Sequence, residues 1–160
     1  MNATPENLLR RCRDFRWEGV EARLYKEEPG ASFRAISRHA LFDDAALGCE
    51  LRYFEMAPGG HSSLERHEHT HAVMILRGRG HCLLGTAVHR VAAFDLLTIP
   101  AWTWHQFRAT EGAAFGFLCM VNRNRDRPSL PNAEELAVLR ATPSVAAFLD
   151  GDRPAELSRR

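Results

Sequence analysis

The chain has 160 residues, with 21 Lys and Arg against 20 Asp and Glu, and a formal net charge of +1 at pH 7. A chain of this length forms one domain that buries roughly two-thirds of its unfolded surface. Because the net charge is close to zero, we expect neither nucleic acid nor a membrane as a partner. Local basic clusters occur at 10–13 and 123–127, and we interpret them as solvated or salt-bridged surface rather than phosphate-binding patches.

The first residues, Met1 to Asn7, lack the basic and apolar regions of a secretory signal. No run of ~20 apolar residues occurs that could span a bilayer. We therefore expect a cytoplasmic protein. The cysteines form no Cys-x-x-Cys pair, and we interpret them as buried thiols rather than disulfides or ligands: Cys12, Cys49, Cys82 and Cys119.

The first predicted element is a short helix from Pro5 to about Asp14, opened by the capping residue Thr4. From Trp17 to Met120, short alternating or apolar segments are separated by turn signals, which is typical of antiparallel β structure. The candidate strands cover about 18–26, 32–41, 49–57, 63–67, 71–77, 81–85, 88–92, 95–99, 105–110 and 113–121. They are numerous enough for a double-sheet or barrel architecture.

Two helices are predicted after the strands. Asn132 and Glu135 form a capping-box pattern that opens a helix to about Arg140, and Pro143 opens a second helix that stops at Gly151. We expect their apolar residues to pack on the barrel exterior: Leu136, Val138, Leu139, Val145, Phe148 and Leu149. The prediction is a single domain over 1–160, with a barrel core at about 17–121 and a helical extension at about 132–150.

One stretch gathers residues that bind metals. Glu65, His67, His69 and His71 occupy alternate positions, which share one face in an extended strand, and His105 follows later. Imidazole and carboxylate are ligands of divalent transition metals, so the pattern predicts a metal site. The alternative is a solvated edge strand, with His105 as a hydrogen-bonded core residue. The remaining histidines are interpreted as surface or structural residues: His39, His61, His81 and His89.

The spacing of Glu65, His67, His71 and Gly78 resembles the first motif of the cupin family. A stretch from Asp95 through Pro100 to His105 and Phe107 resembles the second motif. The resemblance covers about residues 48 to 121. It implies an all-β fold, a double-stranded β-helix or jelly-roll barrel, whose lumen holds one divalent metal.

Counting back from Gly78 places His71 where the family usually has glutamate, with His67 and Glu65 at its two histidine positions. The resemblance therefore favours Glu65, His67, His71 and His105 as metal ligands, with His69 as a neighbouring base or alternate ligand. An unshifted alignment would use His67, His69, His71 and His105. The second motif departs from the family at Phe94 and Trp102, where glycine is usual, and at Ala109, where asparagine is usual.

Three imidazoles and one carboxylate leave open positions on a divalent ion, which indicates a reactive site rather than a structural one. Iron, manganese, nickel and zinc all suit these ligands. Trp102 and Trp104 precede His105, and Phe107 follows it, so we expect aromatic walls around a small-molecule substrate. In the alternative, one tryptophan plugs the barrel end and the other covers the C-terminal helices.

Arg52 shares a strand face with Glu50 and Phe54. If that face points into the lumen, Arg52 can anchor a substrate carboxylate; otherwise it is a surface arginine. The resemblance implies a metal-dependent enzyme acting on a small organic molecule, by dioxygenase or related isomerase or lyase chemistry. The rival is a non-catalytic cupin that binds or senses a small molecule. Because jelly-roll sheets leave exposed edges, we expect a homodimer.

Overall fold

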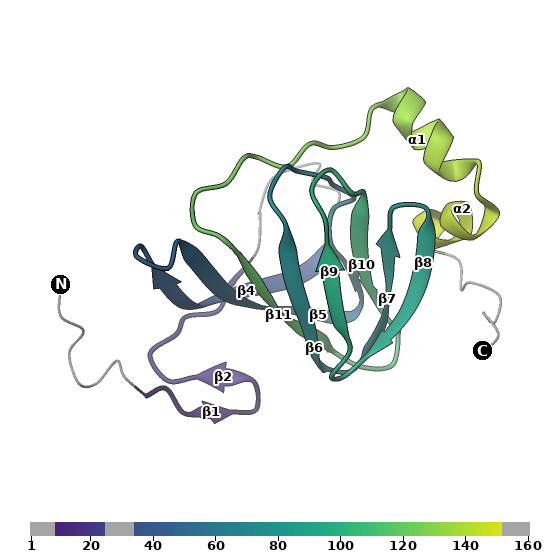
Figure 1. Ribbon diagram of the computed structural model, residues 1–160. Helices are drawn as coiled ribbons and strands as arrows, with labels where there is room; N and C mark the ends of the chain where they lie inside the picture. The colour runs from purple at the N-terminus through teal and green to yellow at the C-terminus, as the bar shows by residue number, and fades with distance from the viewer. Residues whose placement is uncertain (1–8, 25–33, 152–160) are drawn as a thin grey trace.

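The computed structural model describes residues 9–24 and 34–151 (Figure 1). In these residues the strands are β1 (Cys12–Arg13), β2 (Arg16–Trp17), β3 (Arg23–Leu24), β4 (Arg34–Asp44), β5 (Cys49–His61), β6 (His71–Arg77), β7 (Arg79–Leu84), β8 (Ala87–Ala92), β9 (Leu96–Ile99), β10 (His105–Ala109) and β11 (Phe115–Asn122). Two helices follow, α1 (Ala133–Arg140) and α2 (Pro143–Asp150).

Strands β3 to β11 form one antiparallel sheet that curls into an open barrel (Figure 1). Neighbouring strands follow the order β8-β7-β10-β5-β11-β6-β9. Outside this order, β4 pairs with β5, and β3 pairs with β4. The long strand β5 pairs with β4, β10 and β11, so one strand joins the two halves of the barrel. The predicted all-β jelly roll is confirmed.

The barrel is filled by alternate side chains of its strands. On β11, Phe115, Phe117, Cys119 and Val121 are all buried, whereas Met120 between them is exposed. This is the period of two expected when one face of a sheet packs on the core. Each fully buried aliphatic or aromatic side chain contributes ~1.5–3 kcal/mol relative to its exposed state. The core therefore fixes which residues of each strand point into the lumen.

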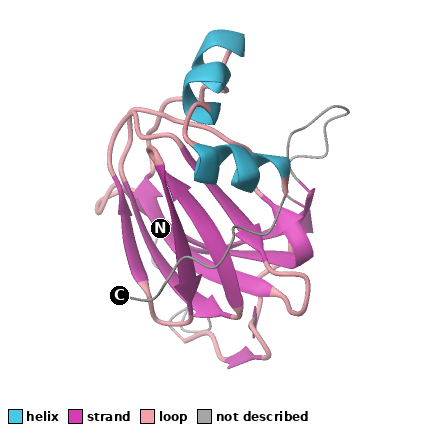
Figure 2. Ribbon diagram, turned by 90° about the vertical axis from the view of Figure 1, so that its right-hand side faces the viewer, coloured by secondary structure: helices cyan, strands magenta, loops and turns pink. Residues whose placement is uncertain are grey.

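Both predicted helices are confirmed: α2 lies against the strands near β8, and α1 packs on α2 and projects beyond the end of the barrel (Figure 2). Asn132 and Glu135 form the capping box of α1, and Gly151 ends α2 in a left-handed conformation. Helix residues Leu139, Val145 and Phe148 pack with barrel residues in a second cluster that includes Leu64, Leu83 and Val88. The expectation for Val138 is wrong, because its side chain points away from this cluster and is exposed.

The N-terminal helix predicted over 5–14 is wrong where it can be compared; residues 5 to 8 lie outside the described residues. Cys12 is exposed, on a short strand that pairs with Arg16 and Trp17. The rings of Phe15 and Trp17 pack on Tyr53 of β5, at centroid distances of 6.0 and 5.0 Å. These contacts with the sheet override a local capping signal that has only weak intrinsic strength.

The predicted strand 63–67 is also corrected. Glu65 and Arg66 form only isolated bridges, to His105 and Ser129, and the chain bends at Glu68 and His69. The predicted strand 18–26 is reduced to β3, and its last two residues lie outside the described residues. No described helix is long and apolar enough to cross a membrane. The homodimer stays a prediction.

Candidate metal centre

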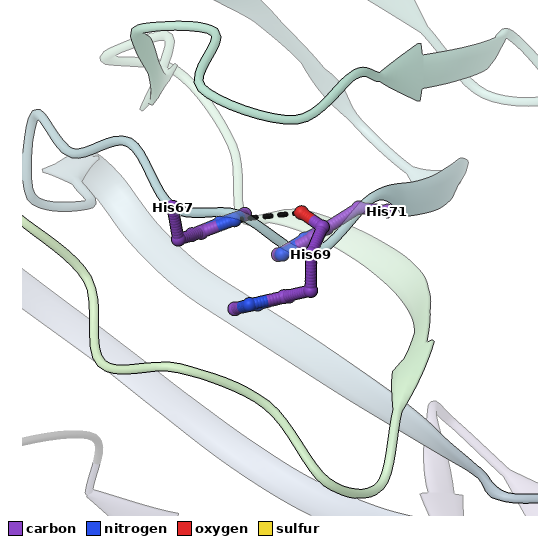
Figure 3. A group of neighbouring side chains, drawn as sticks. All are labelled: His67, His69 and His71. Atoms are coloured by element: carbon purple, nitrogen blue, oxygen red, sulfur yellow. Dashed lines mark hydrogen bonds between the residues drawn. The ribbon is translucent and has the colours of Figure 1, made fainter.

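The histidines meet at one end of the barrel because the starts of two strands and one bend converge there. His71 begins β6 and His105 begins β10. Glu65 and His105 exchange two backbone hydrogen bonds, of 3.1 and 3.0 Å, which place the two side chains side by side. The bend at Glu68 and His69 turns the chain back on itself. As a result, Nδ1 of His67 lies 2.8 Å from the carbonyl oxygen of His69 (Figure 3). The alternate residues converge through this bend, not through an extended strand.

The rings are close enough to share an ion. His67 stacks on His69 with centroids 3.6 Å apart and on His71 at 4.4 Å, and the three rings lie nearly parallel (Figure 3). His105 approaches His67 edge-on at 4.9 Å. Two groups of three side chains each bring their ligand atoms within 4.8 Å of one another. The first group is His67, His69 and His71, and the second is Glu65, His67 and His105. All five predicted residues therefore gather in one cluster that can hold a metal.

The hydrogen bonds of the rings suit a metal ion. The Nδ1 atoms of His67 and His105 face backbone carbonyls at 2.8 and 2.9 Å, so these nitrogens carry the hydrogen. Such bonds fix the tautomer and leave a lone pair on Nε2. Among the described residues, the buried Nε2 atoms of His67 and His71 have no hydrogen-bond partner. Buried polar atoms are rarely left unpaired, and a divalent ion would satisfy both.

Burial keeps the imidazoles in the neutral form that binds metals. Desolvation, together with the nearby His105 and His69, lowers the pKa of His67 to about 4. Desolvation likewise lowers the pKa of His71 to about 2, with His105 and His67 adding to the effect. The pKa of His105 is also lowered by burial. No proton therefore competes with an ion for these nitrogens near pH 7.

Asp126, in the loop after β11, supports His69. Its carboxylate accepts hydrogen bonds from the backbone N–H of Glu68 at 2.8 Å and from the His69 ring at 2.6 Å. Burial opposes ionisation of Asp126, but these bonds outweigh it and hold the pKa of the carboxyl well below its ordinary value. Sequence analysis missed this residue because it lies in the charged segment 123–127, which we interpreted as surface.

Two cavities adjoin the cluster. The outer cavity, of about 360 Å³, is lined by His67, His69 and His71 and by four arginines: Arg23, Arg38, Arg52 and Arg125. The inner cavity, of about 50 Å³, lies in the barrel core and is mostly apolar. Arg52, Glu65 and His71 line both cavities, so the cluster stands where the two meet.

The substrate-binding residues predicted from sequence fall in different places. Arg52 is buried and lines both cavities, and Phe107 lines the inner one. Trp102 is 55% exposed, and Trp104 lies under the Arg66 guanidinium at 4.4 Å and packs beside the helix cluster. Neither tryptophan lines either cavity. The position of Trp104 matches the alternative in which it covers the C-terminal helices.

Cys119 is a site neighbour that sequence analysis placed only among buried thiols. Its Sγ lies 3.2 Å from Nδ1 of His71 and 3.4 Å from Nη2 of Arg52. Burial raises the pKa of this thiol, although Arg52 opposes the effect. Cys119 therefore presents a protonated thiol to the inner cavity at neutral pH. Its position in the alternating inward pattern of β11 is the signal that would have found it.

The matches with known proteins agree with this arrangement. Residues 52–121 match the family model described as a cupin domain. The chain is also 60% identical over 137 residues to 1-methylthio-D-xylulose 5-phosphate methylsulfurylase from Rhodospirillum rubrum, a match that covers 86% of this chain and 88% of that protein. The chain belongs to the cupin family.

Two further comparisons are informative. The structure of a cupin 2 conserved barrel domain protein from Rhodopseudomonas palustris is 52% identical, with a TM-score of 0.84 over 88% of this chain and 97% of that one. A 5-nitrosalicylic acid 1,2-dioxygenase from Bradyrhizobium sp. is 33% identical over 63 residues, or 39% of this chain and 28% of that protein.

In this cupin, the two departures from the glycines of the second motif keep a glycine-like backbone. Phe94 has φ of 76° and Trp102 has φ of 58°, both in the left-handed region. The Trp102 N–H donates to the His67 carbonyl at 2.7 Å, which ties the loop before His105 to the metal-binding cluster. The motif geometry is thus preserved although its glycines are absent.

Proposed function

We propose that this cupin is a metal-dependent enzyme that cleaves the C1–S bond of 1-methylthio-D-xylulose 5-phosphate. The named substrate of the 60% identical relative supports this choice. It carries a phosphate at one end, a methylthio group at the other and a C2 carbonyl between them. The observation that carries the proposal is the placement of the metal-binding cluster between an arginine-lined cavity and an apolar one.

The outer cavity suits the phosphate. Guanidinium groups bind phosphate through paired, charge-assisted hydrogen bonds. Arg125 is held at the rim by Glu50 at 2.8 Å, and Arg23 by Glu21 at 3.1 Å. The lining itself has four arginines and two carboxylates, those of Glu65 and Asp126, while Glu50 and Glu21 offset the charges of Arg125 and Arg23. We assign phosphate binding to Arg38 and Arg125, so the segment 123–127 is more than a salt-bridged surface.

Glu65, His67, His71 and His105 would hold the ion, and iron, manganese, nickel or zinc suit these donors. A bound divalent ion supplies Lewis-acid polarisation of a carbonyl oxygen. The thiolate of a thiol co-substrate attacks the sulfur of the methylthio group and forms an S–S bond with it. The C1–S bond breaks, and its electron pair passes towards the C2 carbonyl. A proton then replaces sulfur at C1, so the products are a mixed disulfide and a 1-deoxyketose phosphate.

The chain's own residues handle the protons. His69 donates its Nδ1–H to Asp126, which leaves Nε2 as a proton acceptor for the incoming thiol. The protonated thiol of Cys119 faces the inner cavity and can deliver the proton to C1. Arg52 lies 3.4 Å from that sulfur and stabilises the thiolate left behind.

The test is turnover by protein loaded separately with Fe²⁺, Mn²⁺, Ni²⁺ or Zn²⁺, with substrate and a thiol present, followed by the NMR signal of the methylthio group. Arg38→Ala and Arg125→Ala should raise KM about 10- to 100-fold, since each removes a charged hydrogen bond. Arg90→Ala is the control, because Arg90 is exposed on β8 and lines neither cavity. Binding of substrate without turnover by any metal form would leave the non-catalytic alternative.

A dioxygenase reaction is the second candidate, and the 63-residue match to the nitrosalicylate enzyme favours it. Oxygen uptake by the iron-loaded protein with small aromatic hydroxy acids tests it. Uptake with these acids and none with the sugar phosphate would replace the first proposal.

A further inference from the structure

The inner cavity has a composition unlike that of the outer one. Its walls include Ile36 of β4, Phe54 of β5 and Phe117 of β11, together with Phe107 and Cys119. The Phe54 and Phe117 rings stack at 5.5 Å between centroids, and Phe107 stacks on Phe117 at 4.6 Å. The stack forms a continuous aromatic wall. Among the polar lining residues, Arg52, Glu65 and His71 lie where the inner cavity meets the outer one, whereas Ser62, Ser63 and His105 line the inner cavity alone.

The volume sets a limit on what can enter. The inner cavity, at about 50 Å³, is much smaller than the outer one, at about 360 Å³. That space holds a small group, and the aromatic wall favours an apolar one. A thioether sulfur also makes favourable contacts with aromatic ring edges. A methylthio group meets all three conditions, whereas a phosphate would meet only Arg52 in the inner cavity and finds Arg23, Arg38 and Arg125 as well in the outer one.

We propose that the inner cavity binds the methylthio group of the substrate and limits its size, with Ile36, Phe54 and Phe117 as specificity-determining residues. This inference rests on the proposed function. The substrate then lies with its phosphate at Arg38 and Arg125 and its C1 sulfur inside the barrel. Arg52, Glu65 and His71, which line both cavities, flank the bond that breaks.

The first test needs no variant. Turnover of 1-methylthio-, 1-ethylthio- and 1-propylthio-D-xylulose 5-phosphate is compared in the wild-type metal-loaded protein. Closely packed cores accept an added methylene poorly, so kcat/KM should fall about 10- to 100-fold with each methylene. Equal kcat/KM values for the three compounds would overturn the inference and leave the proposed function intact. Absence of turnover with all three would count against the proposed function itself.

The second test compares matched variants. Ile36→Ala should raise the ratio of ethylthio to methylthio kcat/KM about 10-fold by enlarging the cavity. Ile75→Ala is the control, because Ile75 is fully buried in the same core cluster but does not line the cavity. A ratio raised equally by both substitutions would show that general loosening of the core, not this cavity, sets the preference.

A second pair of variants keeps the inference testable if Ile36→Ala or Ile75→Ala folds poorly. Phe117→Leu opens the aromatic wall, and Phe115→Leu removes the same atoms from a buried ring that lies outside the cavity lining. The inference predicts acceptance of the ethylthio substrate by Phe117→Leu and wild-type preference in Phe115→Leu. The reverse pattern would contradict it.

Discussion

The carboxylate of Asp126 lies 2.6 Å from Nδ1 of His69 and holds a histidine that precedes it by 57 residues. The same carboxylate accepts the backbone N–H of Glu68, so it also fixes the bend that brings His67 towards His71. A carboxylate that accepts a hydrogen bond from Nδ1 keeps the hydrogen there and leaves the lone pair on Nε2. One loop residue therefore sets both the shape of the cluster and the protonation of its most accessible base.

The contact between Asp126 and His69 predicts that substituting either residue lowers activity without loss of the metal. His69→Ala should lower kcat about 10²- to 10⁴-fold, the usual contribution of a general base. Asp126→Asn should lower kcat by less, since it keeps one acceptor oxygen. Measurement combines kcat with metal content per chain. Asp95→Asn is the control, because its carboxylate accepts the Ala92 N–H in an exposed turn outside the metal-binding cluster. Loss of metal from His69→Ala would move His69 into the ligand set.

The ligand set is tested by metal content alone. Glu65→Ala and His71→Ala should each lose the ion, because each removes one of four donors on which the site depends. Elemental analysis of protein purified without chelators measures this. His89→Ala, at an exposed position on β8, should keep wild-type content. A full equivalent of metal in Glu65→Ala would favour the unshifted set His67, His69, His71 and His105.

Local signals in the sequence predicted most of the architecture. Turn residues and alternation located the strands of the barrel, and the Asn132–Glu135 capping box located α1 to the residue. These signals depend only on residues close together in the chain, so they can be detected in a single sequence. The N-terminal segment failed because its conformation depends on Tyr53, 38 residues after Phe15, whose ring it covers.

The residues of the candidate site likewise fall into those that the sequence predicts and those that only the fold reveals. Glu65, the three histidines and His105 could be predicted because the metal-ligand chemistry is visible in their residue types and spacing. Asp126 and Arg125 could not, since a charged residue in a polar segment looks alike whether it faces solvent or a cavity. Only the fold, which returns the loop after β11 to the bend at His69, distinguishes the two cases.

Backbone strain at Phe94 gives a prediction on stability. A left-handed conformation costs a residue with Cβ about 1–2 kcal/mol, while glycine adds about 0.5–1 kcal/mol of unfolded-state entropy. Phe94 has φ of 76° and its side chain is 79% exposed, so little packing is lost on its removal. Phe94→Gly should therefore raise the free energy of unfolding by about 0.5–1 kcal/mol, or about 1–4 °C in Tm.

Thermal unfolding of Phe94→Gly and Phe94→Ala separates the causes. Alanine removes the exposed ring but keeps Cβ and hence the strain, so its Tm should not rise. An equal rise in both variants would assign the effect to loss of the ring instead.

The buried imidazoles predict a loss of stability in acid for the metal-free protein. Burial lowers the pKa of His67 to about 4 and of His71 to about 2, from an ordinary value of 6.5. Since the unfolded chain binds protons at higher pH than the folded chain, stability is complete above pH 6.5 and falls as the pH drops towards 4. Urea titrations at pH 7, 5.5 and 4 should show a decrease of roughly 6 kcal/mol between pH 7 and 4, about half from each imidazole.

Two comparisons isolate the imidazoles from the carboxylates that also titrate in acid. His71→Gln removes one titrating group and should flatten the pH dependence between 6.5 and 4, whereas His89→Gln, at an exposed site, should not. Saturating metal should stabilise the wild type by similar amounts at pH 7 and 5.5 and by less at pH 4, where protons begin to compete with the ion for His67. A metal effect independent of pH would show that the ion is held without these imidazoles.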